Sequence, residues 1–137
     1  MFASHTIEQL MTRNVVTLES SEPVRKAIRE MVQKDIGNVV VVERGKPVGI
    51  LTERDVMKLS AEGKDVLTTR VSDVMSGRPL ITVTPEINAL EALLIMHRNK
   101  IRRLPATQSG KLLGIVTEND LVHWVIEAAY APSSPPF

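Results

Sequence analysis

Apolar residues form two kinds of pattern along this chain, a stripe with helical spacing and a continuous run that is typical of a buried strand. The clearest helical stripe has apolar residues at i, i+3, i+4, i+7 and i+8: Val24, Ala27, Ile28, Met31 and Val32. A continuous apolar run at 39–42 instead predicts a strand that is buried on both faces. Turn residues at 44–47 then lead into a second strand at 48–51.

The same succession of elements is predicted twice. In the first half we expect a helical turn at 7–11, strands at 15–18, 39–42 and 48–51, a helix from 24 that Ser20 or Ser21 caps, and a helix from 53 to about 59. In the second half we expect a helical turn at 71–75, strands at 80–83, 103–107 and 112–116, a helix that Thr84–Pro85 begins, and a helix from 119 to about 130. Pro105 has no amide hydrogen to donate, so it predicts an edge or a bulge. The order strand, helix, strand, strand, helix predicts an α/β fold, an α+β sandwich.

The second half of the chain repeats the first. Residues 49–55 read GILTERD and residues 114–120 read GIVTEND, so five of the seven positions are identical at a separation of 65. Met11 matches Met75 at a separation of 64. Such self-similarity is the signature of a tandem duplication. We therefore divide the chain into a first repeat with its connector at 1–66, a second repeat at 67–130, and a Pro/Ser-rich end at 131–137 that we expect to be disordered.

Composition and charge narrow the classes of protein. The net charge is +1, so bulk electrostatics favour no acidic partner, and the absence of Cys excludes disulfides and thiolate chemistry. One Trp, one Tyr and two Phe are too few for a surface on which single-stranded nucleic acid stacks. No apolar run reaches the roughly 18–20 residues that a membrane-spanning helix needs. The first residues lack the features of a secretory signal, so we expect a cytoplasmic protein.

The Thr-x-x-Asp of the two motifs has two readings. Thr52 or Thr117 can cap the following helix while Asp55 or Asp120 reaches back to the cap, and this arrangement needs no ligand. The same residues place a hydroxyl, unpaired amides and a carboxylate together at a helix N-terminus. Such a helix end suits a phosphate, and a carboxylate beside it suits the paired hydroxyls of a ribose. The motif alone leaves both readings open.

No other group of residues points to catalysis or to a metal. The sequence shows no Ser/His/Asp, Cys/His or close carboxylate arrangement, so we expect no enzyme, no catalytic residues and no cofactor. His5 and His123 have no partner at the spacing that metal ligands need, so we expect no metal site. His97 falls on the apolar stripe of its helix, where we expect a partly buried, hydrogen-bonded histidine.

The duplicated motifs resemble those of paired cystathionine β-synthase (CBS) domains, the Bateman module, over about Ile7 to Glu127. Three further segments carry the same resemblance: Leu10–Met11, Val74–Met75 and Arg102–Pro105. The resemblance implies two CBS repeats packed with pseudo-twofold symmetry. Members of this family bind AMP, ADP, ATP, S-adenosylmethionine or other adenosyl compounds, and some have no known ligand.

The resemblance also implies a cleft for each motif and a role for the residues in it. The Asp would hold the ribose hydroxyls, the Thr would meet ribose or phosphate, and the leading strand of the opposite repeat would face the adenine. The implied ligand-binding residues are Val16, Thr17, Ile36, Gly37, Thr52, Asp55, Leu80, Ile81, Thr82, Ile101, Arg102, Arg103, Thr117 and Asp120.

The two implied clefts differ in their phosphate contacts. Arg102 and Arg103 match the basic pair that contacts phosphates in nucleotide-binding members, whereas Gly37–Asn38 takes its place in the first repeat. We therefore expect one tight and one weak site for a phosphorylated ligand. The pairing across repeats slightly favours Asp55 as the carboxylate of the tight site.

These observations lead to a hypothesis of function. We expect a stand-alone regulatory module that binds an adenosyl ligand such as AMP, ADP or ATP, senses energy or metabolite state for an unknown regulated protein, and forms a homodimer. One alternative is a purely structural oligomerisation module with empty clefts. Another is an enzyme or a nucleic-acid binder that uses the surface near Arg102 and Arg103, although the net charge of +1 weighs against nucleic acid.

Overall fold

The computed structural model describes residues 5–76 and 78–130. Within this part of the chain, residues gather into two compact units. Val15–Ile81 forms the first-repeat unit, and Met1–Asn14 together with Thr82–Phe137 forms the second-repeat unit. The units therefore divide the chain differently from the repeats in the sequence, because each takes the segment that leads into the other repeat. The end at 131–137, which we expected to be disordered, lies outside the described residues.

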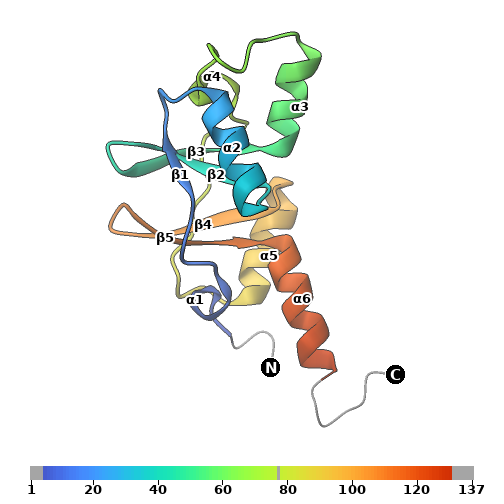
Figure 1. Cartoon of the computed structure of the whole chain (residues 1–137). Coiled ribbons are helices and arrows are strands. Elements are labelled where there is room, and N and C mark those ends of the chain that lie inside the picture. Colours follow the sequence, from blue (N-terminus) through green and yellow to red (C-terminus); the bar gives the residue numbers. More distant parts are fainter. Residues whose placement is uncertain (1–4, 77, 131–137) are drawn as a thin grey trace. The chain divides into compact units, whose positions relative to one another are not determined.

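The first-repeat unit holds a three-stranded sheet in the order β1-β2-β3. The parallel pairing of β1 with β2 and the antiparallel pairing of β2 with β3 place β2 in the centre (Figure 1). The buried run predicted at 39–42 is this central strand, and all four of its valines are buried. The elements of this unit are β1 (Thr17–Glu19), α2 (Val24–Lys34), β2 (Asn38–Glu43), β3 (Lys46–Thr52), α3 (Glu53–Ala61) and α4 (Val71–Val74).

The second-repeat unit holds a two-stranded antiparallel sheet of β4 and β5. Its elements are α1 (Ile7–Leu10), α5 (Ala89–Asn99), β4 (Arg103–Gln108), β5 (Lys111–Thr117) and α6 (Glu118–Ala129). The bulge expected near Pro105 is present, because the register between the two strands shifts between Ala106 and Thr107. The mixed helix and strand content confirms the predicted fold class.

The strand predicted at 80–83 is wrong. Only Val83 pairs, through an isolated parallel bridge to Ala106. In the first repeat the amide of Val40 donates to the carbonyl of Val16 at 3.0 Å, which extends β1 along β2. Pro105 stands at the position that corresponds to Val40 and has no amide hydrogen, so this bond has no counterpart in the second repeat. Pro105 thus limits the parallel pairing of the segment at 80–83 with β4, because it removes one hydrogen-bond donor.

The predicted helix starts at Ser20 or Ser21 and at Thr84–Pro85 are also wrong. Pro23 and Asn88 are the N-cap residues of α2 and α5 instead. The side-chain oxygen of Asn88 accepts from the amide of Glu91 at 2.8 Å, which satisfies one of the free amides of the first turn.

The helical stripe of α2 is narrower than its sequence suggests. Val24, Ala27 and Met31 are buried, whereas the Val32 side chain is 75% exposed. His97 occupies the corresponding position on α5 and is exposed, so its predicted partial burial is wrong. Both residues lie in the last turn before a left-handed residue ends the helix, and there the stripe has turned away from the core.

In each unit a methionine that directly follows a four-residue helix lies against a glycine of the repeated motif. Met75, which follows α4, lies against Gly49 of β3, and Met11, which follows α1, lies against Gly114 of β5. A Cβ atom added at either glycine would come closer than 3.0 Å to the methionine side chain. The absence of a side chain at the Gly of the motif thus lets the methionine pack directly against the strand that runs into the capped helix.

Candidate ligand-binding site

The two Thr-x-x-Asp motifs form capping boxes at the N-termini of α3 and α6. In α3 the Thr52 hydroxyl accepts from the Asp55 amide at 3.3 Å, and Asp55 Oδ2 accepts from the Thr52 amide at 2.9 Å. In α6 the corresponding bonds between Thr117 and Asp120 measure 3.0 and 3.1 Å. The capping reading is therefore confirmed in both repeats, and it brings a hydroxyl and a carboxylate together at each helix end.

The basic pair lies beside the N-terminus of α6 within one unit. The carbonyl of Arg102 accepts from the amide of Glu118 at 2.8 Å, and Arg103 is paired with Thr117 across β4 and β5. Directly opposite residues of an antiparallel pair present their side chains on the same face, so the Arg103 guanidinium and the Thr117 hydroxyl share a face. The Nε atom of Arg103 is buried and has no hydrogen-bond partner in the described structure. An unpaired buried donor is costly, so the Arg103 guanidinium has hydrogen-bonding capacity that the described residues do not use.

The corresponding place in the first-repeat unit has the same backbone and no charge. The carbonyl of Gly37 accepts from the amide of Glu53 at 3.2 Å, and Asn38 is paired with Thr52 across β2 and β3. The substitution of a glycine and an asparagine for the basic pair therefore leaves the helix end in place and removes two positive charges.

The two motif carboxylates have different surroundings. Asp55 is only 3% exposed, and its Oδ2 atom accepts a second hydrogen bond, from the amide of Ser76 at 3.2 Å. Asp120 is half-buried, and its Oδ2 atom accepts from Thr117. The residue that corresponds to Ser76 is Thr12, whose amide donates to the carbonyl of Ile115 at 2.9 Å. In the second-repeat unit the Thr12 amide is therefore hydrogen-bonded to β5 and not to the carboxylate. Asp120 is accordingly more accessible than Asp55.

The remaining predicted site residues are spread over both units. Ile36 and Ile101 follow the left-handed residues that end α2 and α5, and both are half-buried. The other five belong to the two leading segments and are all half-buried or exposed: Val16, Thr17, Leu80, Ile81 and Thr82. The pairing of each motif with the leading strand of the opposite repeat stays a prediction, as does the assignment of the basic pair to Asp55.

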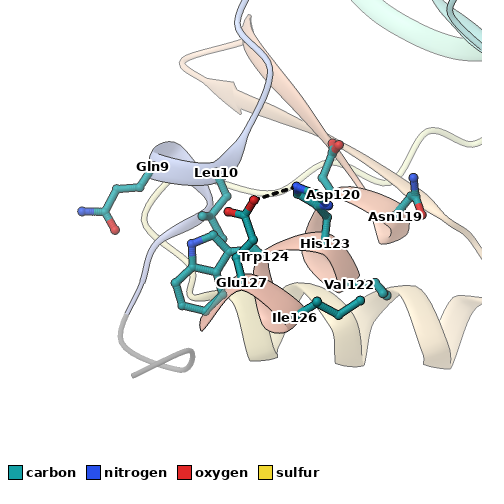
Figure 2. Close-up of a pocket in the computed structure, with 9 residues that line it drawn as sticks. All are labelled: Gln9, Leu10, Asn119, Asp120, Val122, His123, Trp124, Ile126 and Glu127. Carbon is teal, nitrogen blue, oxygen red and sulfur yellow. Dashed lines mark ion pairs between the residues drawn. The ribbon is translucent and has the colours of Figure 1, made fainter. Parts of the chain in front are cut away.

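A hollow of about 420 Å³ lies between α1 and α6. Figure 2 shows its lining, in which Glu127 forms an ion pair with His123 at 3.0 Å. Asp120 is the one predicted site residue among the lining residues, and in Figure 2 its carboxyl group points away from the Trp124 ring. The side chains of the ion pair are 74% and 68% exposed, so the hollow is an open surface feature. The capped end of α6 with its basic pair is the better candidate site.

Over residues 5–76 and 78–130, no three His, Cys, Asp or Glu side chains are grouped so that they could hold a metal ion. No helix in the same part of the chain is long and apolar enough to cross a membrane.

No residue type in the sequence indicates which residue distinguishes the two carboxylates. Ser76 acts through its backbone amide, and any residue except proline supplies one. The match between Met11 and Met75 aligns Thr12 with Ser76 in the two repeats. This alignment was the one feature of the sequence that pointed to these two residues. The direction in which each amide then points depends on the local backbone, which residue identity does not specify.

The chain is similar in sequence to a known family of proteins. The CBS domain family model matches residues 7–62 and 71–127. The chain is 38% identical over 122 residues to an uncharacterized protein of Methanopyrus kandleri, a match that covers 87% of this chain and 62% of that protein. It is 34% identical over 137 residues to the mitochondrial CBS domain-containing protein CBSX3 of Arabidopsis thaliana, covering 91% of this chain and 66% of that protein. The chain thus spans less than two thirds of the length of each of these relatives.

The fold is shared with solved structures. The hexameric CBS-CP12 protein from bloom-forming cyanobacteria matches with a TM-score of 0.80 at 31% identity, over 90% of this chain and 74% of that chain. The tandem repeat that was inferred from the duplicated motif is therefore confirmed by the family model and by a known fold.

Proposed function

Because the chain belongs to the CBS domain family, we propose that it is a regulatory module that binds an adenosyl ligand carrying phosphate, of the AMP, ADP or ATP type. The ligand binds at the N-terminus of α6, beside Thr117 and Asp120. The module reports ligand level to a partner protein by binding, and it catalyses no reaction.

The observation that carries this proposal is the buried, unpartnered Nε atom of Arg103 on the same sheet face as Thr117. A guanidinium binds phosphate oxygens through short, charge-assisted hydrogen bonds. Arg is favoured wherever two of its N–H groups bind a phosphate in a bidentate arrangement. The end of α6 adds the partial positive charge of a helix N-terminus. Asp120 keeps one carboxylate oxygen outside its capping bond, and this oxygen suits the two hydroxyls of a ribose.

The experiment that tests the proposal is titration calorimetry of the whole chain with ATP, AMP and adenosine. Arg103→Asn reproduces the residue that the first repeat carries at this position, so it removes the charge with a side chain that this fold already accepts. One charge-assisted bond is worth about 1.5–3 kcal/mol, so the variant should bind ATP roughly ten- to a hundredfold more weakly. Its affinity for adenosine should change by less than about threefold, because adenosine has no phosphate.

Arg29→Asn is the matched control, since Arg29 is an exposed arginine on α2 in the other unit. It should bind ATP as the parent protein does. If Arg103→Asn binds ATP as tightly as the parent, the basic pair does not hold the phosphates. If no adenosyl compound binds the parent at millimolar concentration, the proposal as a whole is wrong.

A second candidate function is assembly, and the exposed apolar side chains of α5 and α6 favour it. These two helices belong to one unit and expose a group of large apolar residues: Leu90, Leu94, Val122, Val125 and Ile126, each between 38% and 53% exposed. Exposed apolar patches commonly mark protein–protein contacts. We infer that these side chains form the contact of a symmetric homodimer.

Sedimentation velocity tests the assembly. Leu94→Glu places a charge among these side chains, and burying an unpaired charge is strongly unfavourable. The parent should sediment as a dimer at tens of micromolar, and the variant should sediment as a monomer. Val32→Glu, an equally apolar and more exposed position on α2, is the matched control and should leave the dimer intact. A monomeric parent would rule out the dimer.

A further inference from the structure

The exposed face of α5 and α6 is apolar, whereas the same face in the first repeat is mostly polar. At the separation of 65 between the repeats, the exposed residues Leu90, Leu94, Val125 and Ile126 correspond to the exposed residues Arg25, Arg29, Ser60 and Ala61. The fifth member of the apolar group, Val122, corresponds to the exposed Met57. Because α2 accepts arginine at two of these positions, the packing of a repeat does not require apolar residues there. The apolar residues of α5 therefore serve a contact outside their own unit.

Two opposite charges flank the apolar residues of α5. Glu91 and Arg98 are both exposed and stand seven positions apart, with Leu94 between them. Seven positions are about two helical turns, so both charges lie on the same side of the helix, about 10 Å apart along its axis. The Glu91 Oε1 atom accepts from the Asn88 side-chain amide at 3.0 Å, but among the described residues neither Glu91 nor Arg98 forms an ion pair. Each charge is therefore available to a partner of opposite sign.

The charge pattern distinguishes two ways of pairing two copies of α5. If the two helices were parallel, Glu91 would face Glu91 of the partner subunit, and Arg98 would face Arg98 of the partner subunit. Like charges that face each other across an interface are unfavourable. If the helices are antiparallel, each Glu91 faces an Arg98, and the twofold symmetry supplies this pair twice. We propose that two copies of the chain pair through antiparallel α5 helices, with Glu91 of each copy opposite Arg98 of its partner; this inference rests on the proposed homodimer.

The antiparallel pairing places the twofold axis beside Leu94. Positions 94 and 95 lie midway between 91 and 98, so the same residues of the two copies meet at this point. Leu94 is 43% exposed in its own unit and Leu90, about one turn away, is 47% exposed. Both side chains become buried in the pair, and the charged residues lie toward its ends. An apolar centre with a polar rim is the usual arrangement of a protein–protein interface.

The pairing belongs to the second repeat alone. The corresponding face of α2 carries three exposed positive charges, Arg25, Lys26 and Arg29. Two copies of this face would repel each other. If the face instead lay against α5 of a partner, its charges would be buried among leucines, which is also unfavourable. In the dimer α2 therefore stays in contact with solvent.

Sedimentation velocity of charge-reversal variants tests the orientation. Glu91→Lys introduces the residue type that the first repeat has at this position, Lys26, so the fold already accepts it. In the antiparallel pair, Glu91→Lys and Arg98→Glu each create two contacts between like charges and should weaken the dimer by about tenfold. The double variant Glu91→Lys/Arg98→Glu exchanges the two charges and should dimerise within about threefold of the parent.

Mixing the two single variants tests whether the charges meet between copies. A heterodimer of Glu91→Lys with Arg98→Glu contains two pairs of opposite charge, so the mixture should associate with about the affinity of the parent. An effect within one chain would not be relieved by mixing. Arg29→Glu, a charge reversal at an exposed position of α2, is the matched control and should dimerise as the parent does.

Each part of the inference has its own contradicting result. A dimeric parent whose single variants dimerise with unchanged affinity would overturn the antiparallel orientation and leave the homodimer standing. A double variant that is folded by circular dichroism but does not recover, or a mixture that does not, would overturn the pairing of Glu91 with Arg98. A weaker dimer in Arg29→Glu would overturn the assignment to the second repeat alone. A parent that is monomeric at tens of micromolar would refute both the homodimer and this inference, and the proposed ligand binding would be unaffected.

Discussion

The two motif glycines offer a matched pair of substitutions, Gly49→Ala and Gly114→Ala. Both glycines lie on buried strands and neither has a positive φ, so the backbone itself accepts alanine at both positions. At Gly49 the three atoms nearest to an added Cβ all belong to the Met75 side chain. At Gly114 they are Met11 Sδ at 2.6 Å, Met11 Cγ at 2.8 Å and the backbone oxygen of Thr12 at 2.8 Å.

The backbone oxygen makes Gly114→Ala the more destabilising of the two. A thioether chain can turn away at little cost, but Thr12 is held to Ile115 by two hydrogen bonds of 2.9 Å. Overpacking costs about 1–3 kcal/mol and weakening of a hydrogen bond about 0.5–1.5 kcal/mol. Each alanine also reduces the conformational entropy of the unfolded chain, which stabilises the folded protein by about 0.4–1 kcal/mol. We expect Gly114→Ala to lower the free energy of unfolding by about 2 kcal/mol and Gly49→Ala by about 0.5 kcal/mol or less.

Urea unfolding followed by circular dichroism measures both values, and scanning calorimetry gives the melting temperatures. At roughly 4 °C per kcal/mol for a chain of this size, Gly114→Ala should melt about 8 °C below the parent and Gly49→Ala within about 2 °C of it. Equal losses in the two variants, or a larger loss for Gly49→Ala, would refute the argument that a backbone atom decides the cost.

Three further predictions concern a helix cap, a buried side chain and the charge of the site. Asn88→Ala should lower the free energy of unfolding by about 1 kcal/mol in urea unfolding, because the amide of Glu91 loses its acceptor, while Asn119→Ala on the exposed first turn of α6 should change it by less than about 0.5 kcal/mol. Met31→Ala should cost about 2–5 kcal/mol and the adjacent Val32→Ala less than about 0.5 kcal/mol, since the first side chain is buried and the second is 75% exposed; similar costs would contradict the observed packing of α2. Raising the salt concentration should weaken ATP binding and leave adenosine binding nearly unchanged in calorimetry, and an equal effect on both would argue against a phosphate contact.

The parts of the fold that depend on residue type at a fixed spacing could be predicted from the sequence. Thr52 and Asp55 stand three positions apart before an apolar helix, and this spacing alone indicates a capping box, which the structure contains. The run of valines at 39–42 likewise indicates a buried strand. In these cases the physical cause lies within a few residues of its effect, so a local pattern is sufficient.

Other parts depend on residues that are far apart in the chain. The strand expected at 80–83 fails because Pro105, more than twenty positions later, cannot donate a hydrogen bond. The second hydrogen bond to Asp55 Oδ2 comes from Ser76, which follows it by 21 positions and contributes an amide that every residue except proline has. A pattern of residue types contains neither the partner strand nor the direction of a backbone amide, so these features required the structure.

The exchange of leading segments between the two units has a consequence for the order of events during synthesis. The first-repeat unit, Val15–Ile81, is one uninterrupted stretch and can form as soon as that stretch has been made. The second-repeat unit must bring residues 5–14 to residues made much later, as in the hydrogen bond from the Ala89 amide to the His5 carbonyl at 3.0 Å. Until then Met11 has no Gly114 to pack against, so a segment that is synthesised before the first-repeat unit reaches its packed position only after that unit has been made.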